Sequence, residues 1–304
     1  MAGAFQHRAY QGVSNLRSAT TIAFDWLVIA AAIWASESIG GPLAWLIAAF
    51  VIGGRMMALV EVLGHDAAHE MLFTPRQLNR RLDFLYFVPF GDTWEGYREH
   101  HLPHHARLMD ERDPALQDFR RWGLYDPGRS FWWACVVRPF LALETLHDLA
   151  SFARALRDDP TTRRKILSFW IPAAAAITWF DGWWLLLVYW LVPLLWIKPG
   201  LEFWSEVSDH FAVAGAATRS SRGLVQRIFL NPHGDGWHAL HHRFPRIPCF
   251  ALPRAHRDYA AVASEPLPVR TFAQTVLEVW RAKAAQRRAT ESPNTALDAG
   301  GVGQ

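Results

Sequence analysis

The sequence predicts an all-α integral membrane protein, with about four transmembrane helices in two hairpins and a helical cap on one side of the bilayer. Three observations predict this class. The chain of 304 residues is 51% hydrophobic and only 19% charged. Its mean hydropathy of +0.01 is nevertheless close to zero, and its apolar residues are gathered in long stretches. A chain that is part membrane span and part polar cap averages in this way, and its length suffices for one large domain.

Long apolar stretches supply the predicted spans. Four of them carry at most one charged side chain each: residues 21–35, 42–60, 166–180 and 183–197. A helix needs about 20 mainly apolar residues to cross a hydrocarbon core of about 30 Å. The first two stretches, which contain Asp25 and Arg55, reach this length with their flanks. The last two are separated by a polar turn at Asp181. The alternative is a soluble bundle of long core helices.

The placement of arginine predicts the orientation. The loops within the two hairpins, residues 36–41 and 180–182, contain no lysine or arginine, whereas residues 64–165 contain 14 arginines and one lysine. Segments rich in these residues stay in the cytoplasm, so we expect this segment and both termini there, at the inner membrane of a bacterial cell. The net charge of +3 therefore indicates membrane topology rather than nucleic-acid binding.

Three segments follow from these spans. Residues 1–20 are predicted to form a cytoplasmic lead-in, residues 21–283 a single membrane domain, and residues 284–304, which lack hydrophobic periodicity, a disordered tail. Arg55 is expected near the cytoplasmic end of the second span, where its long side chain would reach towards the interface.

Shorter elements are expected at the membrane surface. Residues 82–90 are apolar but too few to span the bilayer. Residues 140–156 combine an apolar and a polar face, which is typical of a helix lying on the membrane and puts His147 on the solvated face. Pro103 is expected in the first turn of a helix, where its missing N–H leaves no hydrogen bond unmade.

Histidines form three closely spaced groups in the polar segments, GHDAAHE, HHLPHHARL and WHALHHRFP. Their spacings are H-x3-H, H-x2-H-H and H-x2-H-H. The eight candidate ligands are His65, His69, His101, His104, His105, His238, His241 and His242. Residues three and four apart share a helix face, so each group can direct its imidazoles at one point. Imidazole binds iron, copper and zinc, and eight are more than one metal needs. The sequence therefore predicts two metal ions on the cytoplasmic side.

Other interpretations of the histidines are weaker. A zinc-peptidase pattern H-E-x-x-H opens at His69 but meets Phe73 where its second histidine belongs. A shifted H-x3-H spacing would use His100 in place of His101. His233, five residues before the third group, is expected to shape the turn or to line the site.

In this order and spacing, the three groups resemble the histidine boxes of the membrane fatty acid desaturase and hydroxylase superfamily. The resemblance covers roughly residues 25–252 and includes the Phe-Pro pair after the third box. It implies a non-haem di-iron centre that activates O2 and attacks an unactivated C–H bond. By position, the eight box histidines match the family's ligands, and His210 matches a ninth ligand that relatives supply just after the last span.

The chain departs from the family's pattern at Glu206, four residues before His210. Some relatives have asparagine there, where it contacts iron through water. A carboxylate would ligate or bridge the metals, or would orient a histidine by accepting its second N–H. Glu206 and Asp209 are therefore the candidate catalytic residues. Other acidic residues beside candidate ligands are Glu61, Asp66 and Asp235.

The resemblance implies a reaction class but no single substrate. We expect an O2-dependent oxidase that introduces a double bond into a lipid or fatty-acyl substrate. Hydroxylation or ketolation of a carotenoid- or alkane-type substrate is the alternative. A membrane metal-binding or transport protein is a third reading, which is disfavoured because transport sites usually lie near the bilayer midplane and the histidines lie outside the predicted spans.

Such a centre consumes two electrons in each turnover, and the chain carries no source of them. Cys135 and Cys249 are too few for a rubredoxin or Fe–S site, and no flavin, nicotinamide or cytochrome b5 signature is present. We therefore expect a separate donor of ferredoxin, rubredoxin or cytochrome b5 type. The arginine-rich face would attract an acidic carrier, and topology with lipid contact would also explain it.

Overall fold

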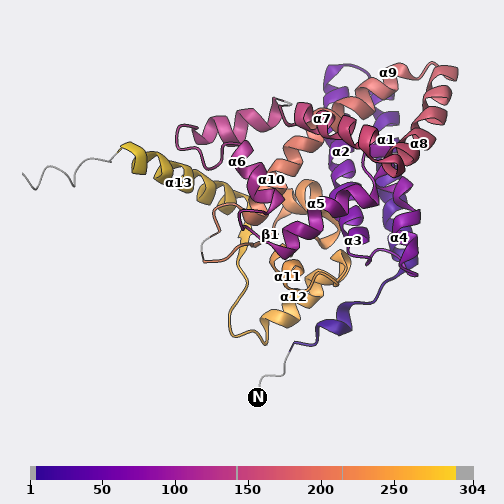
Figure 1. Cartoon of the computed structure of the whole chain (residues 1–304). Coiled ribbons are helices and arrows are strands. Elements are labelled where there is room, and N and C mark those ends of the chain that lie inside the picture. Colours follow the sequence, from indigo (N-terminus) through magenta and orange to yellow (C-terminus); the bar gives the residue numbers. More distant parts are fainter. Residues whose placement is uncertain (1–4, 142, 214, 292–304) are drawn as a thin grey trace, which may run out of the picture.

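The computed structural model describes residues 5–141, 143–213 and 215–291, which fold mainly into helices (Figure 1). Three helices are long and apolar enough to cross a membrane: Asn15–Ile39, Pro42–Ala68 and Trp183–His210. This is the pattern of an integral membrane protein. The membrane-protein class is confirmed to this extent.

The first two long helices pack against each other. Ser14 starts α1 (Asn15–Ile39), because its hydroxyl accepts the N–H of Arg17. The helix thus begins inside the segment expected to be a lead-in. Gly40 and Gly41, both with positive φ, connect it to α2 (Pro42–Met57). The same rod continues as a π-helix, η2 (Ala58–Gly64), and as α3 (His65–Ala68), which carries the first histidine box.

Arg55 of α2 points into the protein, so the prediction that it reaches to the interface is wrong. Its Nη1 lies 3.0 Å from Oδ1 of Asp25 on α1, and its Nη2 donates to the carbonyl of Ile228 at 2.6 Å. Nε2 of His233 lies 2.8 Å from the other Asp25 oxygen. The Asp25 side chain is fully buried, and in such a low-dielectric site a partnered charge is favoured over a solitary one.

The expected third span falls on α8 (Pro160–Trp179), which is not among the three apolar helices. Its first turns carry Arg163, Arg164 and Lys165, so its uncharged part is residues 166–179. Fourteen residues make about 21 Å of helix, less than the core thickness of about 30 Å. The final long helix combines α9 (Trp183–Leu186), η7 (Leu187–Leu191), η8 (Pro193–Ile197) and α10 (Lys198–His210).

The other elements are η1 (His7–Tyr10), α4 (Gln77–Arg81), η3 (Asp83–Leu85), η4 (Val88–Phe90), α5 (Trp94–Ala106), α6 (Pro114–Arg121), η5 (Trp132–Val137), η6 (Arg138–Phe140), α7 (Leu143–Asp158), η9 (Gln226–Leu230), η10 (Pro232–Gly234), α11 (His238–Arg243), η11 (Cys249–Ala251), α12 (Leu252–Ala260) and α13 (Phe272–Glu291). Among them, α11 and α12 lie below α5, and α6 and α7 lie above it, in Figure 1. The predicted surface helix corresponds to α7. Helix α13 runs eight residues into the expected tail, of which residues 292–304 lie outside the described part of the chain.

Pro103 lies inside α5 rather than in its first turn, which corrects the expected start of this helix. The helix begins earlier, where the hydroxyl of Thr93 accepts the N–H of Gly96 at 3.1 Å. Proline cannot donate to the carbonyl of Glu99, one turn before it. Glu99 is exposed, so water can take this hydrogen bond. Box two is therefore presented by a helix three turns long.

Two short strands correct the all-α expectation. Strand β1 (Ser220–Arg222) pairs in parallel with β2 (Val269–Thr271), with Ser220 opposite Val269. Each strand has three residues and no alternating apolar pattern, so periodicity gives no signal for them. The pair nevertheless bears on the site, because β1 lies against α10 and α11, which carry metal-ligand candidates.

Candidate metal centre

Nine imidazoles gather in two clusters. The five-histidine cluster consists of His65, His69, His101, His105 and His241, and the four-histidine cluster of His104, His210, His238 and His242. Within each cluster the candidate ligand atoms lie within 4.8 Å of one another. The structure thus brings together all nine predicted ligands. His100 is exposed and belongs to neither cluster, so the shifted spacing is not the one used.

Helix geometry explains how the boxes are divided between the clusters. On α5, His101 and His105 are four residues apart and face the five-histidine cluster, whereas His104 faces the other. On α11 the roles are reversed. His238 and His242 share the four-histidine cluster, and His241 points to the five-histidine one. Each H-x2-H-H box therefore serves both metal positions at once.

In the five-histidine cluster the Nε2 atoms meet one another. Nε2 of His69 lies 2.8 Å from that of His101 and 3.2 Å from that of His105, and the latter lies 3.1 Å from Nε2 of His241. The His65 ring lies against His241, with centroids 4.2 Å apart. Both nitrogens of His65 are buried without a hydrogen-bond partner.

The four-histidine cluster has the same character. Nε2 of His210 lies 3.2 Å from that of His104 and 2.9 Å from that of His238, which in turn lies 2.9 Å from Nε2 of His242. A neutral ring nitrogen either donates or accepts one hydrogen bond, so chains of facing nitrogens satisfy each other poorly. A cation between them takes up all their lone pairs. The residues present therefore fit a pair of metal ions.

The outward nitrogens of several rings have acceptors that set their orientation. Nδ1 of His104 lies 2.9 Å from Oδ1 of Asp113, and Nδ1 of His210 lies 3.3 Å from the carbonyl of Ala217. Such acceptors fix the tautomer so that Nε2 faces the metal. Asp235 approaches Nδ1 of His65 at 3.5 Å and Asp209 approaches Nδ1 of His238 at 3.8 Å, both too long or poorly aligned to count as hydrogen bonds.

Burial favours the neutral form of six of the box imidazoles, which is the form that binds a metal. Desolvation, with the neighbouring imidazoles adding to it, lowers the pKa of His105 to about 3. The pKa values of five further box histidines are lowered in the same way: His69, His101, His238, His241 and His242.

The candidate catalytic acids are placed differently from each other. Asp209 accepts the hydroxyl of Ser221 at 3.1 Å and the amide of Asn231 at 3.2 Å, which fixes it beside His238. Glu206 lies one turn before His210 on α10 and belongs to neither cluster. No hydrogen bond of its carboxylate to a histidine is found among the described residues. Neither proposed role of Glu206 is visible in the geometry.

Two of the other predicted acids, Asp66 and Glu61, bind partners other than the clustered histidines. Asp66 accepts the backbone N–H of Cys249 at 2.8 Å, so it ties α3 to η11. Glu61 binds Lys198 at 2.7 Å, and Lys198 also binds Glu202 at 2.7 Å. This ion-paired group joins η2 to α10 one turn below the histidines.

Two supporting residues carry no signal in the histidine pattern. Asp113 lies nine positions after His104, and its Asp-Pro pair indicates only a helix start. Arg219 is almost fully buried and donates to the carbonyls of Ser208, Val207 and Phe211. A guanidinium at this place satisfies the last carbonyls of α10, the helix end that presents His210.

Known proteins with similar sequences are desaturases. The dihydrorhizobitoxine desaturase of Bradyrhizobium elkanii is 27% identical over 82% of this chain and 79% of its own length. The sphingolipid delta(4)-desaturase/C4-monooxygenase of Rattus norvegicus is 27% identical over 69% of this chain, and the match spans 64% of the rat protein, slightly less than two thirds. The sn-1 acyl-lipid omega-3 desaturase (ferredoxin) of Synechocystis sp. is 24% identical over 74% of this chain and 68% of its own length.

The family model for fatty acid desaturases matches residues 40–273, well over half of the chain. The matched region contains all nine clustered histidines and the last two of the three long apolar helices. The chain therefore belongs to the fatty acid desaturase family and is a membrane oxidoreductase.

Proposed function

We propose that the two clusters bind a pair of non-haem iron ions and that the chain uses them with O2 to introduce a double bond into a lipid substrate. The observation that carries this proposal is the convergence of nine imidazoles from separate elements into two adjacent metal positions. When bound, a di-iron pair supplies the activation of O2 that attack on an unactivated C–H bond requires. The protein's part is to hold the ligands neutral, oriented and shielded from water.

Desaturation of a lipid is the reaction that the relatives support best, since their names describe desaturases of sphingolipids and acyl-lipids. Hydroxylation is the second candidate, because the rat relative is also named as a monooxygenase. Glu206 and Asp209 remain the candidate catalytic residues, since both lie on α10 within one turn of His210. Transport is set aside because the family consists of oxidoreductases.

We further propose four spans in two hairpins, with α8 as the third. Its basic first turns would lie at the headgroups, where long cationic side chains reach the interface. The 14 arginines of residues 64–165 support a cytoplasmic location for the metal centre and for both termini. Leu146 on α7 is 68% exposed, which supports contact between this helix and the membrane surface. In a bacterial cell this membrane would be the inner one.

The electrons would come from a separate carrier. The Synechocystis relative is named as a ferredoxin enzyme, which supports a ferredoxin here and leaves rubredoxin and cytochrome b5 as alternatives. The carrier would approach the cytoplasmic face, because that is where the histidine clusters are proposed to lie.

Lipid profiling by mass spectrometry tests the reaction. Cells that express the chain with a reductase system would be compared with cells that express His238→Ala. A mass change of about −2 indicates desaturation, about +16 hydroxylation and about +14 ketone formation, from the count of atoms gained and lost. His147→Ala serves as the matched control, because His147 is exposed on α7. Iron loading without O2 uptake, given a competent reductant, would contradict the proposal.

A further inference from the structure

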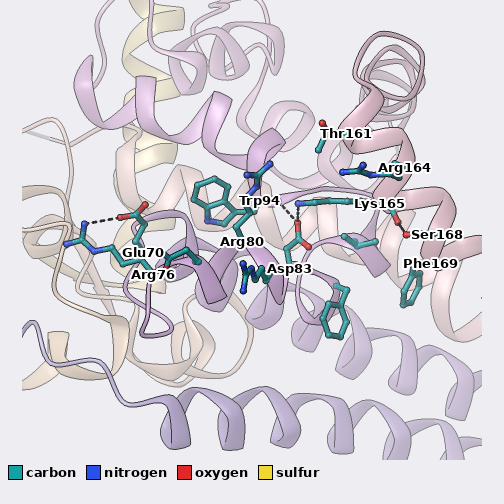
Figure 2. Close-up of a pocket in the computed structure, with 14 residues that line it drawn as sticks. Glu70, Arg76, Arg80, Asp83, Trp94, Thr161, Arg164, Lys165, Ser168 and Phe169 are labelled. Carbon is teal, nitrogen blue, oxygen red and sulfur yellow. Dashed lines mark hydrogen bonds and ion pairs between the residues drawn. The ribbon is translucent and has the colours of Figure 1, made fainter.

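A groove of about 990 Å³ is lined by residues of the segment after the first histidine box, of α4 and of α8 (Figure 2). One wall is formed by α4 and the turn after it, with Arg80, Arg81 and Phe84. Another part of the lining is formed by the first turns of α8, with Arg164 and Phe169. None of the nine clustered histidines lines it, so the proposed oxidation chemistry does not account for it.

The groove carries an excess of positive charge. Five cationic side chains line it (Arg76, Arg80, Arg81, Arg164 and Lys165) against two acidic ones (Glu70 and Asp83), which leaves five minus two, or three, net positive charges. Glu95 does not line the groove but forms an ion pair with Arg80. If its charge is included, two net positive charges remain.

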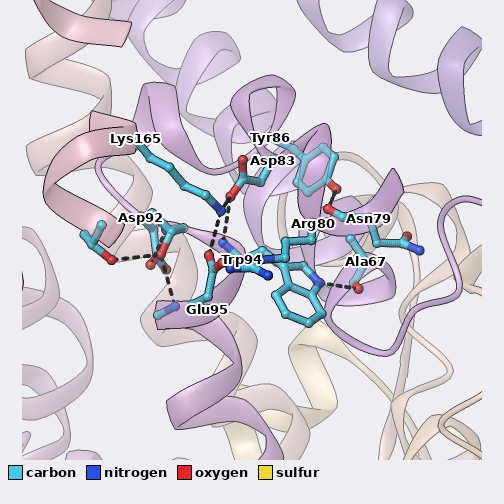
Figure 3. Close-up of polar contacts among 12 residues, drawn as sticks. Ala67, Asn79, Arg80, Asp83, Tyr86, Asp92, Trp94, Glu95 and Lys165 are labelled. Atoms are coloured by element: carbon cyan, nitrogen blue, oxygen red, sulfur yellow. Dashed lines mark hydrogen bonds and ion pairs between the residues drawn. The ribbon is translucent and has the colours of Figure 1, made fainter. Parts of the chain in front are cut away.

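Ion pairs within the groove wall neutralise part of this positive charge. Lys165 lies 2.6 Å from Asp83 and 2.7 Å from Glu95 (Figure 3), and Arg80 lies 2.5 Å from Glu95. The Asp83 side chain is 5% exposed, so these ion pairs are built into the protein. Arg76 reaches Glu70 at 3.4 Å.

The two remaining cations of the groove, Arg81 and Arg164, have no ion-pair partner among the described residues. Both side chains are exposed, and neither has a hydrogen bond or ion pair within the part of the chain that the structure describes. Both line the groove, Arg81 from α4 and Arg164 from α8. Two guanidinium groups facing one space fit a phosphate, which accepts paired N–H donors from arginine.

The groove combines charged and aromatic side chains, and at one end Arg164 and Lys165 lie near Phe169. Figure 2 shows Glu70 and Arg76 at one end and Ser168 and Phe169 at the other. Phe169 belongs to the uncharged part of α8, which continues to Trp179. A small inorganic anion would leave the aromatic wall uncovered. The lining of α8 from Thr161 to Phe169 is about 12 Å long, which suits a headgroup with the start of an acyl chain better than the convex face of a protein.

We propose that this groove binds an anionic phospholipid, with Arg81 and Arg164 holding its phosphate and Phe84 and Phe169 contacting the start of its acyl chain. The site is separate from the metal centre, and its existence does not depend on the reaction proposed above. A lipid bound here would join α4 to α8. It would also contact Trp94 in the groove wall, whose indole N–H donates to the carbonyl of Ala67 between His65 and His69 at 2.8 Å.

The test uses the full chain purified in a non-ionic detergent and titrated with phosphatidylglycerol. Native mass spectrometry counts the bound lipid, and the thermal unfolding midpoint reports stabilisation. The double variant Arg81→Gln/Arg164→Gln is expected to bind phosphatidylglycerol about 30-fold more weakly, since each arginine near an anionic lipid contributes about fivefold. Arg281→Gln/Arg288→Gln is the matched control, because both arginines are exposed on α13 and lie outside the groove.

Each other outcome overturns the proposal. Equal binding by the groove variant and the control variant would remove the assignment of the site. Equal stabilisation by phosphatidylcholine would show that charge is not recognised, and equal stabilisation by inorganic phosphate or glycerophosphate would show a free-anion site. A loss of ferredoxin-dependent reduction without a loss of lipid binding would instead identify a docking site for the carrier. Unchanged iron content in the groove variant verifies that it is folded.

Discussion

Asp113 anchors one imidazole of the four-histidine cluster from outside. Its Oδ1 lies 2.9 Å from Nδ1 of His104, while its two oxygens also accept the N–H groups of Met109 and Ala115. Burial alone would raise the pKa of this carboxyl, but the hydrogen bonds from His104 and the backbone outweigh it, so that its pKa is lowered. The carboxylate is thus held charged next to a ring that must keep its Nε2 free for a metal.

The substitution Asp113→Asn is expected to weaken metal binding in the four-histidine cluster. It keeps the size of the side chain but removes the charged acceptor that orients His104, and loss of such a partner typically lowers metal affinity about 10–100-fold. Iron titration with metal analysis of the purified protein measures the effect. Asp110→Asn removes an exposed carboxylate on the same loop and is expected to leave iron affinity unchanged. Equal affinities for both variants would show that Asp113 has no positioning role.

Substitution of Glu206 tests whether its carboxylate binds a metal ion or only lies near the clusters. Because its carboxylate belongs to neither cluster, Glu206→Gln is expected to retain two irons per chain, whereas His210→Ala should lose the ion of the four-histidine cluster. Metal analysis after iron loading separates the two. Loss of one iron in Glu206→Gln would mean that the carboxylate ligates or bridges the metals.

At this scale the sequence predicted which histidines gather into the clusters but not the residues that orient them. Spacing within the boxes identified the eight box histidines, because i, i+4 neighbours face one way in any helix, and the family resemblance added His210. The division into five and four depends on how α3, α5, α10 and α11 meet, which no local spacing contains. Asp113 was missed for the same reason, since its contact with His104 is made by the loop after α5.

Among the helices, a buried charge network ties the first long pair to the loop before box three. Asp25 on α1 meets Arg55 on α2 and His233 on η10. His233 has a φ of +57°, a conformation that side chains other than glycine rarely adopt. Because Asp25 holds His233 in this conformation, the pair fixes the turn from which α11 and its three clustered histidines start.

Arg55→Met should destabilise the protein by about 3–5 kcal/mol, because it leaves the Asp25 carboxylate buried without its main counter-charge. The double variant Asp25→Asn/Arg55→Met removes both charges and is expected to recover part of this loss. The thermal unfolding midpoint in detergent provides the measurement. If the double variant is as unstable as the sum of the two single variants, the pair is not coupled and the network has no joint role.

Sequence patterns predicted the long helices but not where the shorter elements begin and pair. The long apolar helices were predictable from composition, since few other structures use such stretches. The start of α5 was not, because the cap at Thr93 outweighs the preference of Pro103 for a first turn. Strands β1 and β2 gain their pairing only from the fold, which places Ser220 against Val269. The inward turn of Arg55 likewise depends on a partner 30 positions away.

For the molecule as a whole, gathering nine imidazoles in one place makes stability depend on pH. Six box histidines (His69, His101, His105, His238, His241 and His242) have lowered pKa values in the folded chain, mainly through burial, and that of His105 falls to about 3. In the unfolded chain they titrate near 6.5. Below about pH 6.5 the unfolded state therefore binds more protons than the folded state, which favours unfolding.

Metal-free protein is accordingly expected to lose stability as the pH falls from 7 to 5, by up to about 1.4 kcal/mol per pH unit for each histidine that is protonated only on unfolding. Unfolding midpoints in detergent at a series of pH values measure this slope. His105→Gln should reduce it, whereas His147→Gln, on the exposed face of α7, should not. The carboxyl of Asp113 titrates at lower pH because its pKa is lowered, whereas burial raises the pKa of Asp92 to about 7, and a carboxyl of that kind opposes the slope from the histidines. Iron-loaded protein should be more stable throughout, and acid should release its metal, since protons compete for the same nitrogens. A flat profile between pH 7 and 5 would mean that the imidazoles are not held neutral by burial.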